Sequence, residues 1–247
     1  DILRFHAVYW PAFLMASKLP LPKRIFGHGW ILSDEKKMSK SLGNILDPLD
    51  IIEKFGIDQL RYYLIKEVSL GNDGNISLEN LKNCINNDLA NNYGNLCQRV
   101  FTFLKKNCEN KIPKSDTFSD EDKALTSKLK QDVKKLNEFI NNQDLNLYLK
   151  QVIDYSFDSN KYFNDSEPWA LKKTDPKKMN SVLYSIVEQI KNISILLLPV
   201  IPNSANKILD IINVNKDSRD ITKINKSNNL NHEKELGHIE ILFKKVE

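Results

Sequence analysis

Residues 35–44, EKKMSKSLGN, combine ammonium and hydroxyl side chains in a segment that has little apolar surface to bury. Lys37 and Lys40 are three positions apart, and Ser39 and Ser41 lie beside them. Such a segment cannot bury itself, and its ammonium and hydroxyl groups could instead bind a negatively charged ligand that arrives from solution. The same residue types also fit a solvated turn, so the pattern alone leaves both interpretations open.

The elements that would position this loop are short and of mixed type. The hydrophobic pattern predicts, in order, an apolar helix to about residue 19, a strand over residues 24–32, and helices over residues 47–56 and 58–68. Asp47 followed by Pro48 is a typical helix start, and Gly56 is a typical stop. Alternation of this kind is typical of an α/β layer. The cluster LGNDGN at residues 70–75 predicts a turn.

A different pattern begins at Ser77 and continues over long segments. Apolar residues recur every three or four positions, which predicts helices over residues 85–104, 125–140, 145–162 and 182–197, with a further helical stretch at 205–212. Short polar links between long amphipathic helices favour an antiparallel bundle. The Lys- and Asn-rich tail from Asn213 gives no clear prediction. The fold class is therefore a mixed α/β part followed by an all-α part.

The composition of the chain favours a folded protein that does not span a membrane. The chain has 247 residues, 41% of them hydrophobic, and a net charge of +4, which fits a folded protein that can bind a polyanion. Its three cysteines match no zinc pattern and are interpreted as reduced thiols of a cytosolic protein. The longest apolar run, residues 193–201, is too short to cross a bilayer. The chain opens without methionine on an aromatic stretch, so we expect the C-terminal part of a longer protein.

The loop sequence Lys-Met-Ser-Lys-Ser, residues 37–41, resembles the second signature of class I aminoacyl-tRNA synthetases. The resemblance implies that the first part of the chain belongs to a Rossmann-like catalytic domain. It also implies that Lys37 and Lys40 are catalytic and stabilise the pyrophosphate that leaves ATP. The expected ATP-binding residues are Asp1, His28, Gly29, Lys37, Met38, Ser39, Lys40 and Ser41. Loss of Lys40 should lower the activation rate with little change in methionine affinity.

Two N-terminal stretches, DILRFHAVYWPAFLM and FGHGW, resemble methionyl-tRNA synthetases within that class. The resemblance implies a methionine pocket formed by Ile2, Phe5, His6 and Trp10, with Asp1 on the ATP ribose and with His28 and Gly29 near adenine. Aromatic rings suit a thioether because they contact the polarizable sulfur. By helical spacing alone, the same aromatic residues would be assigned to a hydrophobic core.

Two stretches of the helical half resemble the anticodon-reading part of the same family. In NLCQR, residues 95–99, Asn95 and Arg99 are four apart and share a helix face. In SEPWALKK, Trp169 would stack on an unpaired anticodon base. Without the resemblance, Arg99 reads as a surface charge and Trp169 as a core aromatic residue.

The resemblance as a whole implies a methionine–tRNA ligase that uses ATP with Mg²⁺, methionine and tRNA(Met), in the cytoplasm and away from membranes. We expect residues 1–72 to end the catalytic domain, 73–213 to bind the anticodon, and 214–247 to pack back toward the catalytic domain. The HIGH-type histidine motif of the class is absent from the sequence, and no metal site is expected. The chain alone should therefore form no methionyl-adenylate without the N-terminal half of its catalytic domain. Another class I synthetase and a non-enzymatic helical RNA-binding module remain as alternatives.

Overall fold

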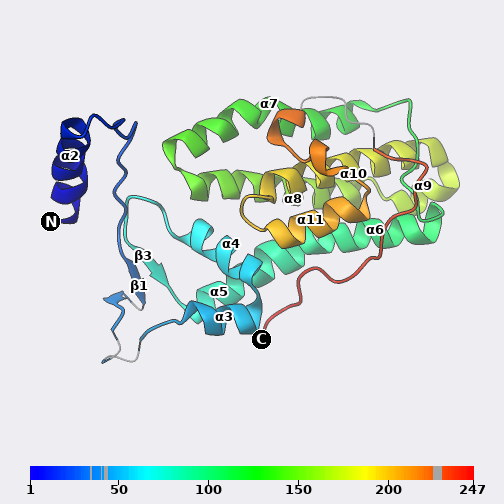
Figure 1. Ribbon diagram of the computed structural model, residues 1–247. Helices are drawn as coiled ribbons and strands as arrows, with labels where there is room; N and C mark the ends of the chain where they lie inside the picture. The colour runs from blue at the N-terminus through cyan, green and yellow to red at the C-terminus, as the bar shows by residue number, and fades with distance from the viewer. Residues whose placement is uncertain (34, 40, 42–43, 225–229) are drawn as a thin grey trace.

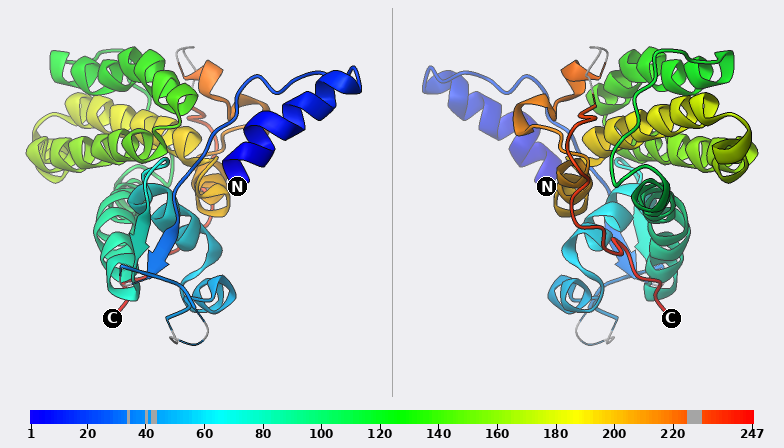
Figure 2. Two further views of the ribbon diagram at one scale, coloured as in Figure 1. Left: turned by 90° about the vertical axis from the view of Figure 1, so that its left-hand side faces the viewer. Right: turned by 90° about the vertical axis from the view of Figure 1, so that its right-hand side faces the viewer.

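The computed structural model describes residues 1–33, 35–39, 41, 44–224 and 230–247, and it has a small mixed part and a larger helical part (Figure 1). The first helix consists of three consecutive segments, α1 (Ile2–Arg4), the π-helical η1 (Phe5–Tyr9) and α2 (Trp10–Ala16). Pro11 lacks the N–H that would continue an α-helical ladder, and the wider π turn before it accommodates its ring. Figures 1 and 2 show this helix standing apart from the rest of the described chain.

A three-stranded sheet lies next along the chain, in the order β2-β1-β3. It consists of β1 (Ile31–Ser33), β2 (Lys36–Lys37) and β3 (Gly74–Ile76). β1 pairs antiparallel with β2, with Leu32 opposite Lys37, and parallel with β3, with Leu32 opposite Asn75. The strand predicted over residues 24–32 is wrong for 24–30, because only Ile31 onward finds partner strands. The turn predicted over 70–75 is wrong at its end, where β3 begins.

Two short helices follow the sheet. α3 (Pro48–Phe55) starts at Asp47, whose side chain accepts a hydrogen bond from the Leu49 N–H at 2.8 Å, and ends at Gly56, as predicted. Gly56 has φ +100°, which favours glycine. α4 (Ile57–Glu67) starts one residue before the predicted Asp58, and Asp58 is buried inside the molecule instead of capping its own helix.

The helical part confirms the predicted bundle (Figure 1). Its elements are α5 (Leu78–Cys84), the π-helical η3 (Ile85–Gly94), α6 (Asn95–Asn107), α7 (Asp120–Asn142), α8 (Leu145–Asp165), α9 (Pro168–Thr174), α10 (Pro176–Leu197) and α11 (Pro202–Ile211). α10 is central and packs against α6, α7, α8, α9 and α11. Its residues Val182, Ile186 and Ile190 are fully buried, as their three-to-four spacing requires. No helix in the described ranges is long and apolar enough to cross a membrane.

The C-terminal tail runs over the bundle after two 3₁₀ turns, η4 (Lys216–Ser218) and η5 (Ile221–Lys223). The N–H of Leu236 donates to the Asn110 carbonyl at 2.7 Å, and the N–H of Gly237 donates to the Ile211 carbonyl at 2.9 Å. The last residues then follow α6 toward α5 (Figure 1). The tail is thus held by backbone hydrogen bonds, which a hydrophobic pattern does not reveal.

Candidate functional site

The lysine-serine loop leaves the small sheet at β2, which holds Lys37. The Lys37 ammonium lies 4.5 Å from the centre of the Trp30 ring, a cation–π contact. The Ser39 N–H donates to Asn44 Oδ1 at 2.9 Å, and the Ser39 and Ser41 hydroxyls are 2.6 Å apart. Met38 is partly buried against the core and anchors the segment. The predicted catalytic Lys40 lies outside the described residues.

The residues assigned to adenine lie on the segment before β1. A Cβ on Gly29 would fall 2.3 Å from the Asn72 carbonyl oxygen, so this glycine permits a close approach between two parts of the chain itself. His28 is exposed, with Nδ1 3.0 Å from the Gly29 carbonyl oxygen. The structure thus gives Gly29 a role in folding, while contact of both residues with adenine stays a prediction.

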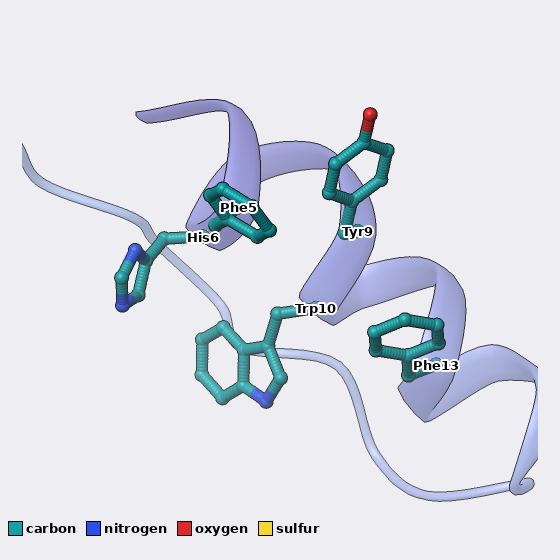
Figure 3. Close-up of a pocket in the computed structure, with 5 residues that line it drawn as sticks. All are labelled: Phe5, His6, Tyr9, Trp10 and Phe13. Carbon is teal, nitrogen blue, oxygen red and sulfur yellow. The ribbon is translucent and has the colours of Figure 1, made fainter. Parts of the chain in front are cut away.

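The predicted methionine-pocket residues lie on the first helix. One open hollow of about 440 Å³ is lined by Phe5, His6, Tyr9, Trp10 and Phe13. Figure 3 shows how these five side chains project from the helix. The Phe5 and Tyr9 rings meet edge to face at 5.3 Å, and His6 Nδ1 lies 2.8 Å from the Ile2 carbonyl oxygen.

The structure brings Phe5, His6 and Trp10 together in this hollow, and it adds Tyr9 and Phe13 as lining residues. Ile2 lies outside the lining, and Asp1 is exposed at the start of the helix. Phe5 and Trp10 are 57% and 44% exposed, so this aromatic stripe is not a core of the described chain.

Arg99 and Trp169 border a second hollow of about 380 Å³, which we call the Trp169 groove. The guanidinium carbon of Arg99 lies 5.0 Å from the centre of the Phe163 ring, and Trp169 meets the same ring edge to face at 5.9 Å. Arg99 also donates to Asn164 Oδ1 at 2.6 Å. Arg99 is therefore held in one orientation, while Trp169 is 47% exposed and keeps a surface on which a planar ring can stack.

Asn95 lies elsewhere, in a third hollow of about 390 Å³ between helix η3–α6 and the C-terminal tail. The tail contributes residues 241–245 to this hollow. We call it the tail groove. Gln98 lines both grooves and so connects them.

Sequence reasoning missed Phe163 and Gln98. Phe163 is the ring that both Arg99 and Trp169 contact, and only its apolar character and its place six residues before Trp169 signalled it. Gln98 is adjacent to Arg99 in the sequence, but nothing in its residue type marked it. In the described ranges, no group of three or more His, Cys, Asp or Glu side chains could hold a metal ion.

Two families of known proteins match the chain. Residues 1–101 match the family described as tRNA synthetases class I (M), and residues 112–247 match the anticodon binding domain of methionyl tRNA ligase. The first match covers the loop and Arg99, and the second covers Trp169. The small sheet, the loop and the helical bundle are therefore those of a class I aminoacyl-tRNA synthetase. Within that class, the chain belongs to the methionyl-tRNA synthetase family.

Relatives of known name support the assignment. The chain is 46% identical over 224 residues to the methionine–tRNA ligase of Brucella suis and 47% identical over 223 residues to that of Rickettsia conorii, covering 91% and 89% of this chain. The Mycobacterium tuberculosis methionyl-tRNA synthetase in complex with methionyl-adenylate superposes with a TM-score of 0.92 at 38% identity over 98% of this chain. The chain spans 44% of the Brucella and Rickettsia proteins and 48% of the Mycobacterium chain, which is less than half of each.

Proposed function

We propose that this chain is part of a methionine–tRNA ligase, which joins methionine to tRNA(Met) through methionyl-adenylate and consumes ATP with Mg²⁺. Membership of the family is the observation that carries the proposal. Methionyl-adenylate in the Mycobacterium relative supports the intermediate. Residues 1–72 would end the catalytic domain, 73–213 would bind the anticodon, and 214–247 would form a tail. The reaction would take place in the cytoplasm.

At the nucleotide end, Lys37 and Lys40 would stabilise the pyrophosphate as the methionine carboxylate attacks the α-phosphate of ATP. The position of Lys37 at the end of a strand supports this role, because a short strand fixes the backbone while the long side chain stays mobile. The hydrogen bonds among Ser39, Ser41 and Asn44 hold two hydroxyl groups next to each other in the segment that follows Lys37. Asp1, His28, Gly29 and Met38 would complete the ATP site.

The aromatic hollow on the first helix would bind the methionine side chain. Phe5 and Trp10 offer ring surfaces for the thioether, and His6 offers a polar group at the edge. Ile2 would cover one side. The exposed fraction of these side chains leaves them open to a ligand.

The Trp169 groove would receive a base of the anticodon. Single-stranded RNA loops are recognised by stacking on aromatic rings and by hydrogen bonds to base edges. Trp169 supplies the ring, and Arg99 supplies donors in a fixed direction because Phe163 and Asn164 hold it. Asn95 would add an amide one helical turn away.

Two measurements test the proposal. The chain itself should bind an anticodon stem-loop RNA with CAU in its loop more tightly than the same hairpin with another triplet. In the full-length ligase that contains this chain, pyrophosphate exchange should depend on methionine and not on cysteine, isoleucine or valine. Exchange with another amino acid would instead assign a different class I synthetase, and binding indifferent to the triplet and to ATP would indicate a general RNA-binding module.

A further inference from the structure

The C-terminal segment is fastened to the bundle on both sides of two lysines. Phe243 is buried, with its ring 6.4 Å from the Tyr93 ring. It lies so close to Gly94 that a Cβ there would be 3.2 Å from the Phe243 ring. Three residues later, the backbone of Val246 forms two hydrogen bonds with the Asn86 side chain, at 2.9 and 2.8 Å. The chain between these two anchors has little freedom.

Lys244 and Lys245 lie between the anchors, and both are exposed. Neither forms an ion pair or hydrogen bond with another residue that the structure describes. They line the tail groove, whose charged lining residues are these two lysines. Two ammonium groups on an anchored backbone, with no acidic partner among the described residues, give this hollow a positive potential that would attract an anionic ligand.

The opposite wall of the tail groove carries three carboxamides. Asn91, Asn95 and Gln98 follow one another along η3 and α6 and line the same hollow. Among the described residues, none of these three side chains has a hydrogen-bond partner, and the Gln98 Oε1 is buried without one. Unpaired amides can both donate and accept, which suits base edges and sugar hydroxyls. Since Gln98 also lines the Trp169 groove, the two grooves are adjacent on the surface of α6.

We infer that the tail groove is a second contact for the anticodon loop, in which Lys244 and Lys245 bind the phosphates next to the base at Trp169. The inference rests on the proposed function, because it takes the ligand of the Trp169 groove to be a single-stranded RNA loop. Lysines that bind phosphates position the RNA but carry no sequence information, whereas the amides of the opposite wall contact bases and sugars.

The test measures RNA affinity against salt concentration, because each phosphate neutralised on a single strand contributes a slope of about 0.7 in log affinity against log salt. The probe is a fluorescently labelled CAU anticodon stem-loop, and its binding is measured by fluorescence anisotropy. The variant K244Q/K245Q should lower the slope by about 1.4 and weaken binding at about 0.1 M salt roughly 10-fold or more. Its preference for CAU over another triplet should stay unchanged.

The matched control is K123Q/K134Q, which removes the same charge from α7, on the other side of the bundle from residues 241–247 (Figure 1). It should keep the wild-type slope. The variant N86A, which retains both lysines but frees Val246, should give an intermediate slope because the lysines lose their fixed position. Both variants should keep the wild-type circular dichroism spectrum.

The outcomes distinguish a failure of the second RNA contact from a failure of the proposed function. A wild-type slope in K244Q/K245Q, together with weak binding by a Trp169 variant, would overturn the second contact and leave the proposed function standing. Equal losses in K244Q/K245Q and K123Q/K134Q would also overturn it, since only net charge would then matter. A wild-type chain that does not bind the CAU hairpin would overturn the proposed function itself.

Discussion

The carboxylate of Asp58 in α4 accepts a hydrogen bond from the backbone N–H of Ser204 in α11, with 2.6 Å between Oδ2 and N. One turn further along α4, Arg61 donates to the carbonyls of Val200 and Pro199, at 2.8 and 2.7 Å. The ends of a helix leave backbone N–H and carbonyl groups without partners inside the helix. Arg61 supplies donors for two carbonyls just after α10, and Asp58 supplies an acceptor for an N–H in the first turn of α11. α4, which follows the lysine-serine loop in the chain, is thereby fixed to the helical bundle.

Loss of the Asp58 carboxylate should therefore destabilise the protein. Asp58 is 3% exposed, and D58A would leave the N–H of Ser204 buried without an acceptor. We expect the free energy of unfolding to fall by about 1–3 kcal/mol. Urea denaturation measures this change, with E53A, an exposed carboxylate of α3, as the control that should change it by less than about 0.5 kcal/mol. Equal effects of the two variants would show that the α4–α11 contact contributes little.

In the proposed methionine–tRNA ligase, removal of the Lys37 ammonium should slow the formation of methionyl-adenylate. K37M should reduce methionine-dependent pyrophosphate exchange by about 10²–10³-fold, the usual cost of one charge-stabilising donor, with little change in methionine affinity. Lys36 precedes it in the same strand, where successive side chains point to opposite faces, so K36M is the matched control. A similar loss in K36M, or a loss confined to methionine affinity, would argue against the assigned role.

Replacement of Trp169 should weaken RNA binding through lost stacking. Stacking of a base on an aromatic side chain contributes about 1–3 kcal/mol, so W169L should raise the Kd for the CAU stem-loop by roughly 5- to 150-fold. W169F should retain part of the affinity. Phe157 of α8 is 49% exposed, close to the 47% of Trp169, and F157L is therefore the control for loss of an exposed ring. If F157L weakens binding as much as W169L, the groove is not the base-binding site.

Stability should fall in alkaline solution because Cys84 keeps its proton in the folded state. Burial raises the pKa of the Cys84 thiol from 9.0 to about 12, against the opposing effect of nearby Lys66. The unfolded state ionises near pH 9 while the folded state does not, so rising pH favours unfolding between pH 9 and 12. Between about pH 8.5 and pH 10, wild-type protein should lose about 1 kcal/mol more unfolding free energy than C84A. Urea titrations at both pH values measure it, and parallel losses in the two proteins would contradict the assignment.

The helical half of the fold was predictable because its determinants are local. Apolar residues such as Val182, Ile186 and Ile190 recur at the helical period, and they fill the core of the bundle. The small sheet was not predictable in the same way. β1 needs β3 as its partner, and residues Gly74–Ile76 are too few and too polar to show a strand pattern. Hydrogen bonds such as that from the Trp30 N–H to Asp73 Oδ1 connect positions far apart in the sequence.

The candidate site residues also fall into those that the sequence could predict and those that it could not. Motif resemblance predicted Arg99 and Trp169, and the structure places both against Phe163. It gave no indication that Asn95 would face the C-terminal tail, because that contact depends on tertiary docking of Phe243 against Gly94. The tail itself carries too little hydrophobic periodicity for its path to be predicted.

The π-helical segment η3 ends at Gly94, immediately before the helix that carries Asn95 and Arg99. A π turn holds more residues than an α turn, so it changes the angular direction of every side chain that follows. Since one residue corresponds to about 100° of rotation in an α-helix, deleting a single residue from this segment would turn Arg99 away from the Phe163 ring. The direction in which Asn95 and Arg99 point is thus set by the winding of the few residues before them, and small insertions or deletions there would reorient this surface without altering any side chain on it.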